Sequence, residues 1–485
     1  MQSKRHILTS LLLLLVVLTV AAEDAFSQRG CRRGVVSAAT RGNRAQGALR
    51  QAGGDFYVGD RRQLVVLVSF SDLQFADSDP VAAWSRIFNE PNLTDAPFHG
   101  SVHDYYYAQS GGQFRLTFDV LHVALGNSIG RYCSTYADDE NSQYLVNDVV
   151  DALLARNVDW GQYDWNGDGY VNQLVLIYPG YGMNDGGGSN TIWPHQWWLS
   201  LHEKDRQQGV YCSPRQVTGS GRNYYVDCYC ALQECANGRK YGSFGTICHE
   251  YTHCFGFPDF YNGGTKYVGA WDLMDSGNNN ADGFCPPNYS AHERWLMGWL
   301  TPVELTATQT IGSMDGTQAY LMRNDGHADE YYIVENRQQT GWDSSLPGSG
   351  LVVFHVDYDE AVWIGTDGYA NSRALQRYTI VPANNQASKP QRWAYPYQAN
   401  DSLTNHSVPA ATLNHANTDG TKLLGKSLRD IRVSGGLASF TFTASPTTGI
   451  VEQTLCRPSE TLYDLGPVVI IRDARGKVKK VLKHR

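Results

Sequence analysis

The sequence lacks most of the features that identify membrane proteins and nucleic-acid-binding proteins. Apart from the N-terminal run from Ile7 to Ala22, it has no long apolar segment, and this run is shorter than the roughly 20 residues that span a bilayer. No run of Lys or Arg alternates with aromatic residues, and the net charge is only −8. These absences argue against an integral membrane protein and give no indication of a nucleic-acid partner.

The N-terminus has the pattern of a secretory signal. Lys4 and Arg5 precede the apolar run, and small residues end it at Ala22. We expect residues 1–22 to be a signal peptide, so the mature protein is predicted to be secreted to the extracellular space or the cell surface. Residues 23–63 are rich in Gly, Arg, Ala and Gln without an apolar period, which predicts a pro-segment or linker.

The remaining chain is long enough for two or three domains. The apolar run from Leu64 predicts a buried strand, residues 143–154 have helical spacing, and residues 171–178 predict a second strand. This alternation predicts an α/β domain with a twisted sheet over residues 64–300. Short strand-like runs separated by Gly, Asn, Asp and Pro then predict an all-β, sandwich-like accessory domain over residues 301–445.

The last segment, residues 446–485, predicts a small strand–turn–strand unit with a basic end. It resembles a shortened form of the C-terminal sorting tails of type IX secretion. That resemblance implies a second contact with secretion machinery, in addition to the one made by the N-terminal signal. The alternative is a terminal hairpin with a solvated basic edge.

The most informative segment has the pattern of a catalytic zinc site. On a helix, His249 and His253 project from one face and can reach one metal, and Glu250 lies beside a metal-bound water. Gly256 can adopt backbone angles that end the helix and turn the chain, so that Asp259 supplies a third ligand. The fourth position then stays open for water or substrate. A glutamate elsewhere in the chain is the competing third ligand.

Several ordered segments resemble the immune inhibitor A family of secreted, metzincin-like zinc peptidases. Besides the motif, they begin at Leu64, Asp104, Ile192, Ser290 and Glu330. Met274, in Trp-Asp-Leu-Met-Asp-Ser-Gly, stands where metzincin-like enzymes carry a methionine turn beneath the metal. The resemblance implies a zinc endopeptidase that cleaves extracellular proteins or peptides, with Asp259 as the third ligand. Glu250 would act first as general base and then as general acid.

Two other functions use the same residues differently. One is a catalytically inactive, calcium-dependent adhesin on a peptidase scaffold, which the intact Glu250 argues against. The other is zinc-dependent hydrolysis of a non-peptide amide, which the ligands alone do not distinguish. Candidates for the oxyanion-stabilising residue are Tyr267, His195 and His292, although an ordinary structural role is the simpler interpretation of each.

A second metal-related pattern lies before the predicted strand at residue 171. Asp164, Asn166 and Asp168 place oxygen side chains at alternate positions, and the Tyr170 carbonyl is available, as in the first half of a calcium loop. The twelfth position is Val175 instead of Glu, which excludes the helix–loop–helix calcium hand. Two interpretations remain open, a loop-to-strand calcium site and an Asx-rich turn without an ion.

The ten cysteines permit disulfides in an exported protein without defining them. A local group precedes the histidine motif: Cys212, Cys228, Cys230 and Cys235. Paired Cys-x-x-Cys units are absent, so disulfides that hold a loop beside the cleft are favoured over a zinc ribbon. Cys248 and Cys254 flank the motif as buried thiols or bridge partners.

Two weaker patterns have simpler explanations than metal binding. Cys31 could block the open metal position of a zymogen, but an ordinary disulfide or free thiol is favoured. His355, Asp357 and Asp359 alternate along a predicted strand, where such residues usually form a solvated face.

Overall fold

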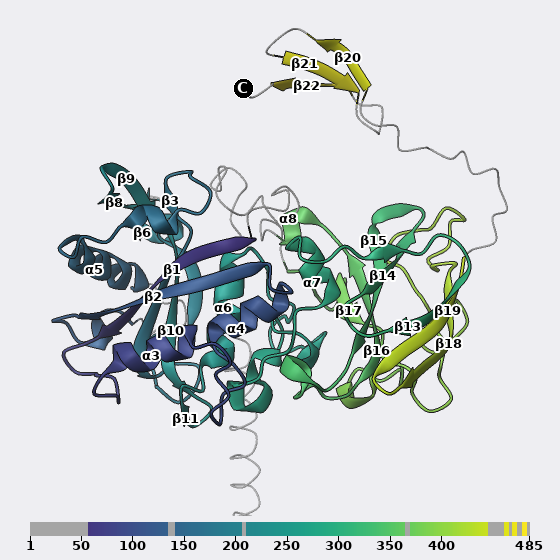
Figure 1. The fold of residues 1–485 in the computed structure, drawn as a ribbon, viewed down its shortest axis with the longest axis horizontal. Coiled ribbons are helices and arrows are strands. Elements are labelled where there is room, and N and C mark those ends of the chain that lie inside the picture. Colours follow the sequence, from purple (N-terminus) through teal and green to yellow (C-terminus); the bar gives the residue numbers. More distant parts are fainter. Residues whose placement is uncertain are drawn as a thin grey trace, which may run out of the picture. The chain divides into compact units, whose positions relative to one another are not determined.

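The computed structural model describes residues 57–133, 141–205, 210–363 and 369–444, together with three short strands near the C-terminus. The chain divides into two compact units, Met1–Ala444 and Ser445–Arg485 (Figure 1). The predicted signal peptide, Cys31 and most of the predicted pro-segment lie outside the described residues. These expectations therefore remain predictions.

The first unit is built around a central six-stranded sheet in the order β11-β10-β4-β1-β2, with β5 paired to β10. Its strands are β1 (Gly59–Ser69), β2 (Phe114–Ala124), β4 (Leu174–Tyr181), β5 (His195–Trp198), β10 (Cys228–Ala236) and β11 (Arg239–Lys240). Strands β2, β1, β4 and β10 run parallel, and β5 and β11 pair antiparallel with β10. The sheet and its helices confirm the predicted mixed α/β fold.

Helices cover both faces of this sheet (Figure 1). They are α3 (Pro80–Asn89), α4 (Val102–Gln109), α5 (Ser142–Leu154) and α6 (Phe244–Cys254). Val65 and Leu67 of β1 face the hydrophobic cluster shared with α3, α4 and α6, whereas Leu64 and Val66 face the cluster shared with α5. Burial on both faces explains the continuous apolar run of β1. Helix α5 confirms the helical spacing predicted for residues 143–154.

The predicted strand over residues 171–178 is divided in two. The structure has β3 (Tyr170–Val171) and β4, separated by Asn172 and Gln173. The Asn172 side chain accepts a hydrogen bond from the Trp165 backbone N–H, and Gln173 donates to Gln63. Four further short strands complete this region: β6 (Glu203–Asp205), β7 (Val210–Tyr211), β8 (Arg215–Gly219) and β9 (Arg222–Val226).

The region after residue 300 contains two sheets. One has the order β12-β14-β15-β16-β17 and the other β13-β19-β18. Their strands are β12 (Val303–Glu304), β13 (Gln309–Met314), β14 (Ala319–Asn324), β15 (His327–Arg337), β16 (Gly350–Asp357), β17 (Tyr378–Ile380), β18 (Ser427–Ser434) and β19 (Leu437–Thr443). Val353 of β16 and Phe440 of β19 belong to one hydrophobic cluster, so the two sheets share a core.

The β-rich region also shares a core with the first sheet. Phe354 and Val356 of β16 belong to the same cluster as Ile247 of helix α6. Helices α7 (Ala291–Leu296) and α8 (Glu360–Trp363) supply further members. Because residues before and after position 300 pack in the same hydrophobic cluster, an independent all-β accessory domain remains a prediction.

The second unit contains an antiparallel sheet in the order β20-β21-β22. Its strands are β20 (Glu460–Asp464), β21 (Val468–Arg472) and β22 (Val478–Leu482).

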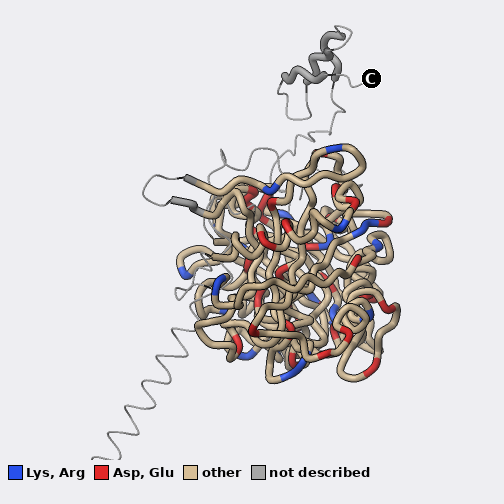
Figure 2. The backbone as a smooth tube through the Cα atoms, turned by 90° about the vertical axis from the view of Figure 1, so that its left-hand side faces the viewer, with Lys and Arg blue, Asp and Glu red and all other residues tan. Residues whose placement is uncertain are grey.

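Acidic and basic residues are interspersed along the described part of the first unit (Figure 2). In the segments that the structure describes, no helix combines the length and apolar character needed to cross a membrane.

Candidate metal centre

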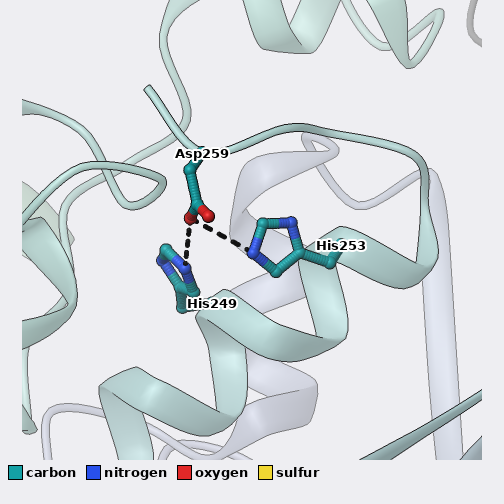
Figure 3. A group of neighbouring side chains, drawn as sticks. All are labelled: His249, His253 and Asp259. Atoms are coloured by element: carbon teal, nitrogen blue, oxygen red, sulfur yellow. Dashed lines mark hydrogen bonds and ion pairs between the residues drawn. The ribbon is translucent and has the colours of Figure 1, made fainter. Parts of the chain in front are cut away.

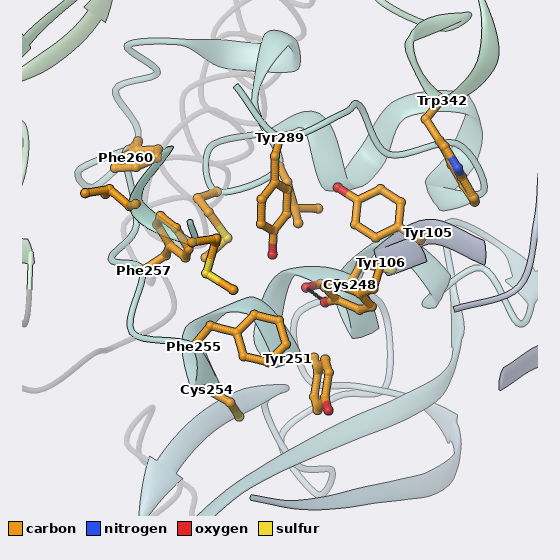
Figure 4. Close-up of a cluster of buried hydrophobic side chains, with 14 of the residues drawn as sticks. Tyr105, Tyr106, Cys248, Tyr251, Cys254, Phe255, Phe257, Phe260, Tyr289 and Trp342 are labelled. Carbon is orange, nitrogen blue, oxygen red and sulfur yellow. Dashed lines mark hydrogen bonds between the residues drawn. The ribbon is translucent and has the colours of Figure 1, made fainter. Parts of the chain in front are cut away.

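Helix α6 carries both histidines of the motif and is buried along its whole length. Aromatic side chains surround it (Figure 4). The Tyr106 hydroxyl donates to the Cys248 carbonyl oxygen at 2.9 Å, and the Thr252 hydroxyl lies 2.5 Å from the Tyr289 hydroxyl. These buried contacts fix the helix against α4 and the chain before α7, which limits movement of the side chains it presents.

The predicted ligands come together at the end of α6. His249 and His253 lie one turn apart, with ring centroids 4.8 Å apart. The helix ends at Cys254, and Gly256 has φ +103°, a value that favours glycine, as the sequence predicted. The following turn returns Asp259 over the two imidazoles (Figure 3).

The geometry suits a single metal ion. Asp259 Oδ1 lies 3.1 Å from His249 Nε2 and 3.3 Å from His253 Nε2. One ligand atom from each residue lies within 4.8 Å of the others, and all three side chains are buried. Across the described ranges of the chain, this is the one group of three or more His, Cys, Asp or Glu found with such spacing.

Backbone carbonyl groups orient both imidazoles. His249 Nδ1 lies 2.8 Å from the Leu273 carbonyl oxygen, and His253 Nδ1 lies 2.7 Å from that of Phe257. A carbonyl oxygen only accepts hydrogen bonds, so each Nδ1 carries a proton, and each Nε2 can offer a lone pair to a metal once it carries no proton of its own. His253 Nε2 is buried, and within the described structure it makes no hydrogen bond beyond its 3.3 Å ion-pair contact with Asp259. A buried imidazole nitrogen with so few polar partners is suited to binding a metal ion.

The charges in the cluster also favour a cation. Burial disfavours ionised Asp259, but the charge of His253 and the hydrogen bond from His249 lower the pKa of Asp259 to about 2. Burial likewise disfavours the imidazolium, yet the hydrogen bond with Asp259 and the negative charge of Glu250 raise the pKa of His249 to about 9. The carboxylates therefore stabilise positive charge between these side chains.

Glu250 is itself buried on α6, directly after the first histidine. Its charge acts on both His249 and Cys230 of the neighbouring strand β10. Glu250 is thus the chain neighbour of His249 on the same helix. This is the neighbourhood that the motif predicted for the general base.

The segment that follows contacts the cluster through its backbone carbonyl groups. Met274 is fully buried, and its carbonyl oxygen accepts a 2.8 Å hydrogen bond from the Phe260 N–H, next to Asp259. Leu273, which orients His249, is the residue before it. Met274 thus lies in a segment that contacts His249 and the residue after Asp259, while its role as a methionine turn remains a prediction.

Asp275 of this segment has a structural role that the sequence did not predict. Asp275 Oδ2 accepts three backbone N–H bonds, from Tyr267, Val268 and Gly269, at 2.8–2.9 Å. A single carboxylate thereby closes the loop between the third ligand and Met274. The motif around Met274 contains this aspartate, but its acceptor role depends on the loop conformation.

Two of the candidate oxyanion-stabilising residues, His195 and His292, lie within hydrogen-bond distance of tyrosine hydroxyl groups. His195 Nε2 lies 3.0 Å from the Tyr229 hydroxyl, on the sheet face opposite α6. His292 Nδ1 lies 3.0 Å from the Tyr331 hydroxyl within an aromatic cluster. These contacts agree with the structural roles that were the simpler interpretation. The Tyr267 backbone belongs to the loop that Asp275 closes.

An aromatic neighbour of the site was also missed. The ring of Tyr261 stacks on His249 with centroids 6.4 Å apart and an interplanar angle of 26°. The ammonium group of Lys266 lies 4.7 Å from the same ring centroid. Tyr261 follows Asp259 by two positions, and this proximity in sequence was the available signal.

In the predicted calcium loop, the side-chain oxygens accept hydrogen bonds from N–H groups of the same loop. The Asp164 carboxylate accepts backbone N–H bonds from Gly167 and Gly169 at 2.9 and 3.0 Å. Asp168 Oδ1 accepts from the Tyr170 N–H at 2.8 Å, and its other oxygen accepts from the Asn166 amide at 3.0 Å. This is the Asx-turn pattern, and calcium binding by these residues remains a prediction.

In the part of the chain that the structure describes, no disulfide joins Cys228, Cys230 or Cys235 to one another, contrary to the predicted local disulfides. Cys228, Cys230 and Cys235 carry thiols, as do Cys248 and Cys254 of helix α6. Cys228 and Cys230 occupy alternate positions of β10, so both point to the face covered by α6 instead of toward a neighbouring loop. The Cys228 sulfur lies 3.9 Å from that of Cys254.

The expectation of a solvated face at His355 and Asp357 is wrong. Both side chains are buried on β16. His355 Nε2 lies 2.8 Å from Glu330, and Asp357 pairs with Arg377 and His415 at 3.2 Å. The burial arises because polar groups of neighbouring strands and loops cover this end of the strand.

The sequence of this chain is similar to those of known peptidases, in agreement with the arrangement of His249, His253 and Asp259. The profile of the immune inhibitor A peptidase M6 catalytic domain matches residues 58–296. Immune inhibitor A of Bacillus thuringiensis subsp. alesti is 27% identical over 304 residues, which cover 51% of this chain and 42% of that protein. Pre-pro-metalloprotease PrtV of Vibrio cholerae is 24% identical over 273 residues, which cover 46% of this chain and 28% of that protein.

The chain therefore spans less than half the length of these relatives. Among solved structures, catalytically inactive OgpA from Akkermansia muciniphila, in complex with an O-glycopeptide substrate, is 11% identical. That alignment covers 57% of this chain and 70% of the other, with a TM-score of 0.24, which supports no argument about fold. On the profile match and the curated relative, residues 58–296 of this chain belong to the immune inhibitor A-like family of peptidases.

Proposed function

We propose that this chain is a secreted zinc-dependent endopeptidase that hydrolyses peptide bonds of extracellular proteins. The observation that carries the proposal is the buried group of His249, His253 and Asp259, with Glu250 on the same helix. The metalloprotease name of a relative, PrtV, supports a metal-dependent reaction. Secretion rests on the signal-like residues 1–22.

The donor set fits zinc. Two imidazole nitrogens and one carboxylate oxygen make a three-ligand catalytic site with a fourth position open to water or substrate. His249 and His253 would bind through Nε2, because the Leu273 and Phe257 carbonyl groups hold their Nδ1 protons. Asp259 would supply the oxygen. Bound zinc supplies Lewis acidity, which polarises the scissile carbonyl group and lowers the pKa of water.

The chain's own residues would move the protons. The Glu250 carboxylate would accept a proton from the attacking water and then donate it to the nitrogen of the leaving amine. Burial of Glu250 and of the histidines excludes bulk water, which strengthens the electrostatic interactions within the site. The two carbonyl contacts and the buried helix keep the histidines in place during turnover.

Metal content and proteolysis, measured on the same purified protein, test this proposal. We expect about one zinc per chain, cleavage of casein, loss of cleavage on chelation and recovery when zinc is restored. Zinc binding without cleavage of casein or a diverse peptide library would contradict the peptidase. A protein that binds no zinc would contradict the metal assignment and favour the alternative, a binding protein on a peptidase scaffold.

A further inference from the structure

A pair of cysteines joins the active-site helix to the central sheet. The sulfurs of Cys228 and Cys254 lie 3.9 Å apart, although the residues are 26 positions apart in sequence. Cys228 is the first residue of β10, and Cys254 is the last residue of α6. Side chains at the ends of elements can approach each other with small backbone adjustments, so the sulfurs can reach the bonding distance of about 2.0 Å.

A third thiol, Cys230, lies nearby on the same face of β10. It is completely buried, whereas Cys228 and Cys254 retain 9% and 7% of their accessible surface. An oxidant can therefore reach the Cys228–Cys254 pair more readily than Cys230. Cys248, the other cysteine of α6, is separated from Cys254 on the helix, as Figure 4 shows.

We propose that Cys228 and Cys254 form a disulfide that links β10 to the end of the active-site helix. Two S–H bonds break and one S–S bond forms, with the release of two protons and two electrons. A disulfide oxidant, such as oxidised glutathione or an oxidised dithiol oxidase, accepts the electrons and protons and becomes two thiols. Disulfides persist in the extracellular compartment expected for this chain.

The link would act on the metal centre through the backbone. Cys254 directly follows His253, a proposed ligand, and lies one turn beyond Glu250. Tying this last turn to β10 limits fraying of the helix end and constrains the unfolded chain. The oxidised protein should therefore melt a few degrees above the reduced protein.

Mass spectrometry tests the link without depending on peptidase activity. The purified full-length protein is incubated with oxidised glutathione, alkylated without reduction and digested with chymotrypsin, which can cut at Tyr229 between Cys228 and Cys230. We expect one peptide pair joining Cys228 to Cys254, which disappears on reduction. Free thiols at both positions after oxidation would overturn the proposal, and so would a link from Cys254 to Cys230.

Matched variants separate the disulfide from general effects of oxidation. Cys254→Ala should abolish the oxidant-dependent rise in melting temperature, and Cys228→Ala should do the same. Cys285→Ala is the control, because this buried thiol contacts the Trp342 carbonyl oxygen and the Ser344 hydroxyl. It should retain the rise. If oxidation raised the melting temperature of folded Cys254→Ala as much as that of the wild-type protein, the proposed link would be contradicted.

Discussion

His249 Nδ1 donates to the Leu273 carbonyl oxygen, 2.8 Å away and 24 positions later in the chain. The segment after the third ligand thus decides which nitrogen of the first ligand faces Asp259. A second carbonyl group, that of Phe257, does the same for His253. The proposed metal centre would therefore depend on the backbone of the turn and loop after α6 as much as on the helix itself.

Replacing Glu250 by Gln should separate catalysis from metal binding. The amide cannot accept and return the proton of the attacking water, so kcat should fall at least about 100-fold. Zinc content should stay near one per chain, since Glu250 is not among the proposed ligands. Glu234→Gln is a matched control, because burial raises the pKa of Glu234 and favours its neutral form. Full activity in Glu250→Gln would refute the assigned role.

Replacing Asp259 by Asn should weaken metal binding. The amide keeps the shape of the side chain but removes its negative charge, which stabilises the two histidines. We expect zinc affinity to fall more than about 100-fold, since loss of a supporting partner alone typically costs 10–100-fold. Competition with a chelator measures this change. Asp119→Asn, on β2, should leave affinity unchanged, and an unchanged affinity in Asp259→Asn would identify another residue as the third ligand.

The sequence predicted the elements whose evidence is local. The i, i+4 spacing of His249 and His253 and the glycine at position 256 place the ligands without knowledge of the rest of the fold. The buried run from Leu64 and the helix over residues 143–154 likewise depend on periodicity alone.

The features that were missed depend on contacts between distant segments. The Leu273 carbonyl group orients His249, yet a backbone carbonyl group is present in every residue and leaves no mark in the sequence. Burial of Asp357 follows from its partners on other strands and loops, so its alternation on β16 could not distinguish a solvated face from a buried network. Cysteine pairing is similarly undefined until β10 and α6 are placed together.

Removing the Asp275 side chain should destabilise the loop that follows the third ligand. Asp275→Ala leaves the N–H groups of Tyr267, Val268 and Gly269 without their acceptor, and we expect a loss of about 2–4 kcal/mol in the free energy of unfolding. Asp275→Asn retains an acceptor oxygen and should lose less. Urea unfolding measures both variants. Equal losses, or a loss in Asp275→Ala below about 0.5 kcal/mol, would show that these bonds do not stabilise the loop.

Glu330 should make stability depend on acid pH. Burial opposes its ionisation, but His355 and the backbone N–H groups of Asn414 and His415 lower the pKa of Glu330 to about 2, from 4.5. A carboxylate with a lowered folded-state pKa contributes stability that is present above its unfolded pKa and is lost as pH falls toward the folded value. The stability advantage of wild-type protein over Glu330→Gln should therefore be about 1–2 kcal/mol near neutral pH and shrink between about pH 5 and pH 2. Urea unfolding at a series of pH values measures the difference, and a constant difference across that range would mean that ionised Glu330 contributes no net stability.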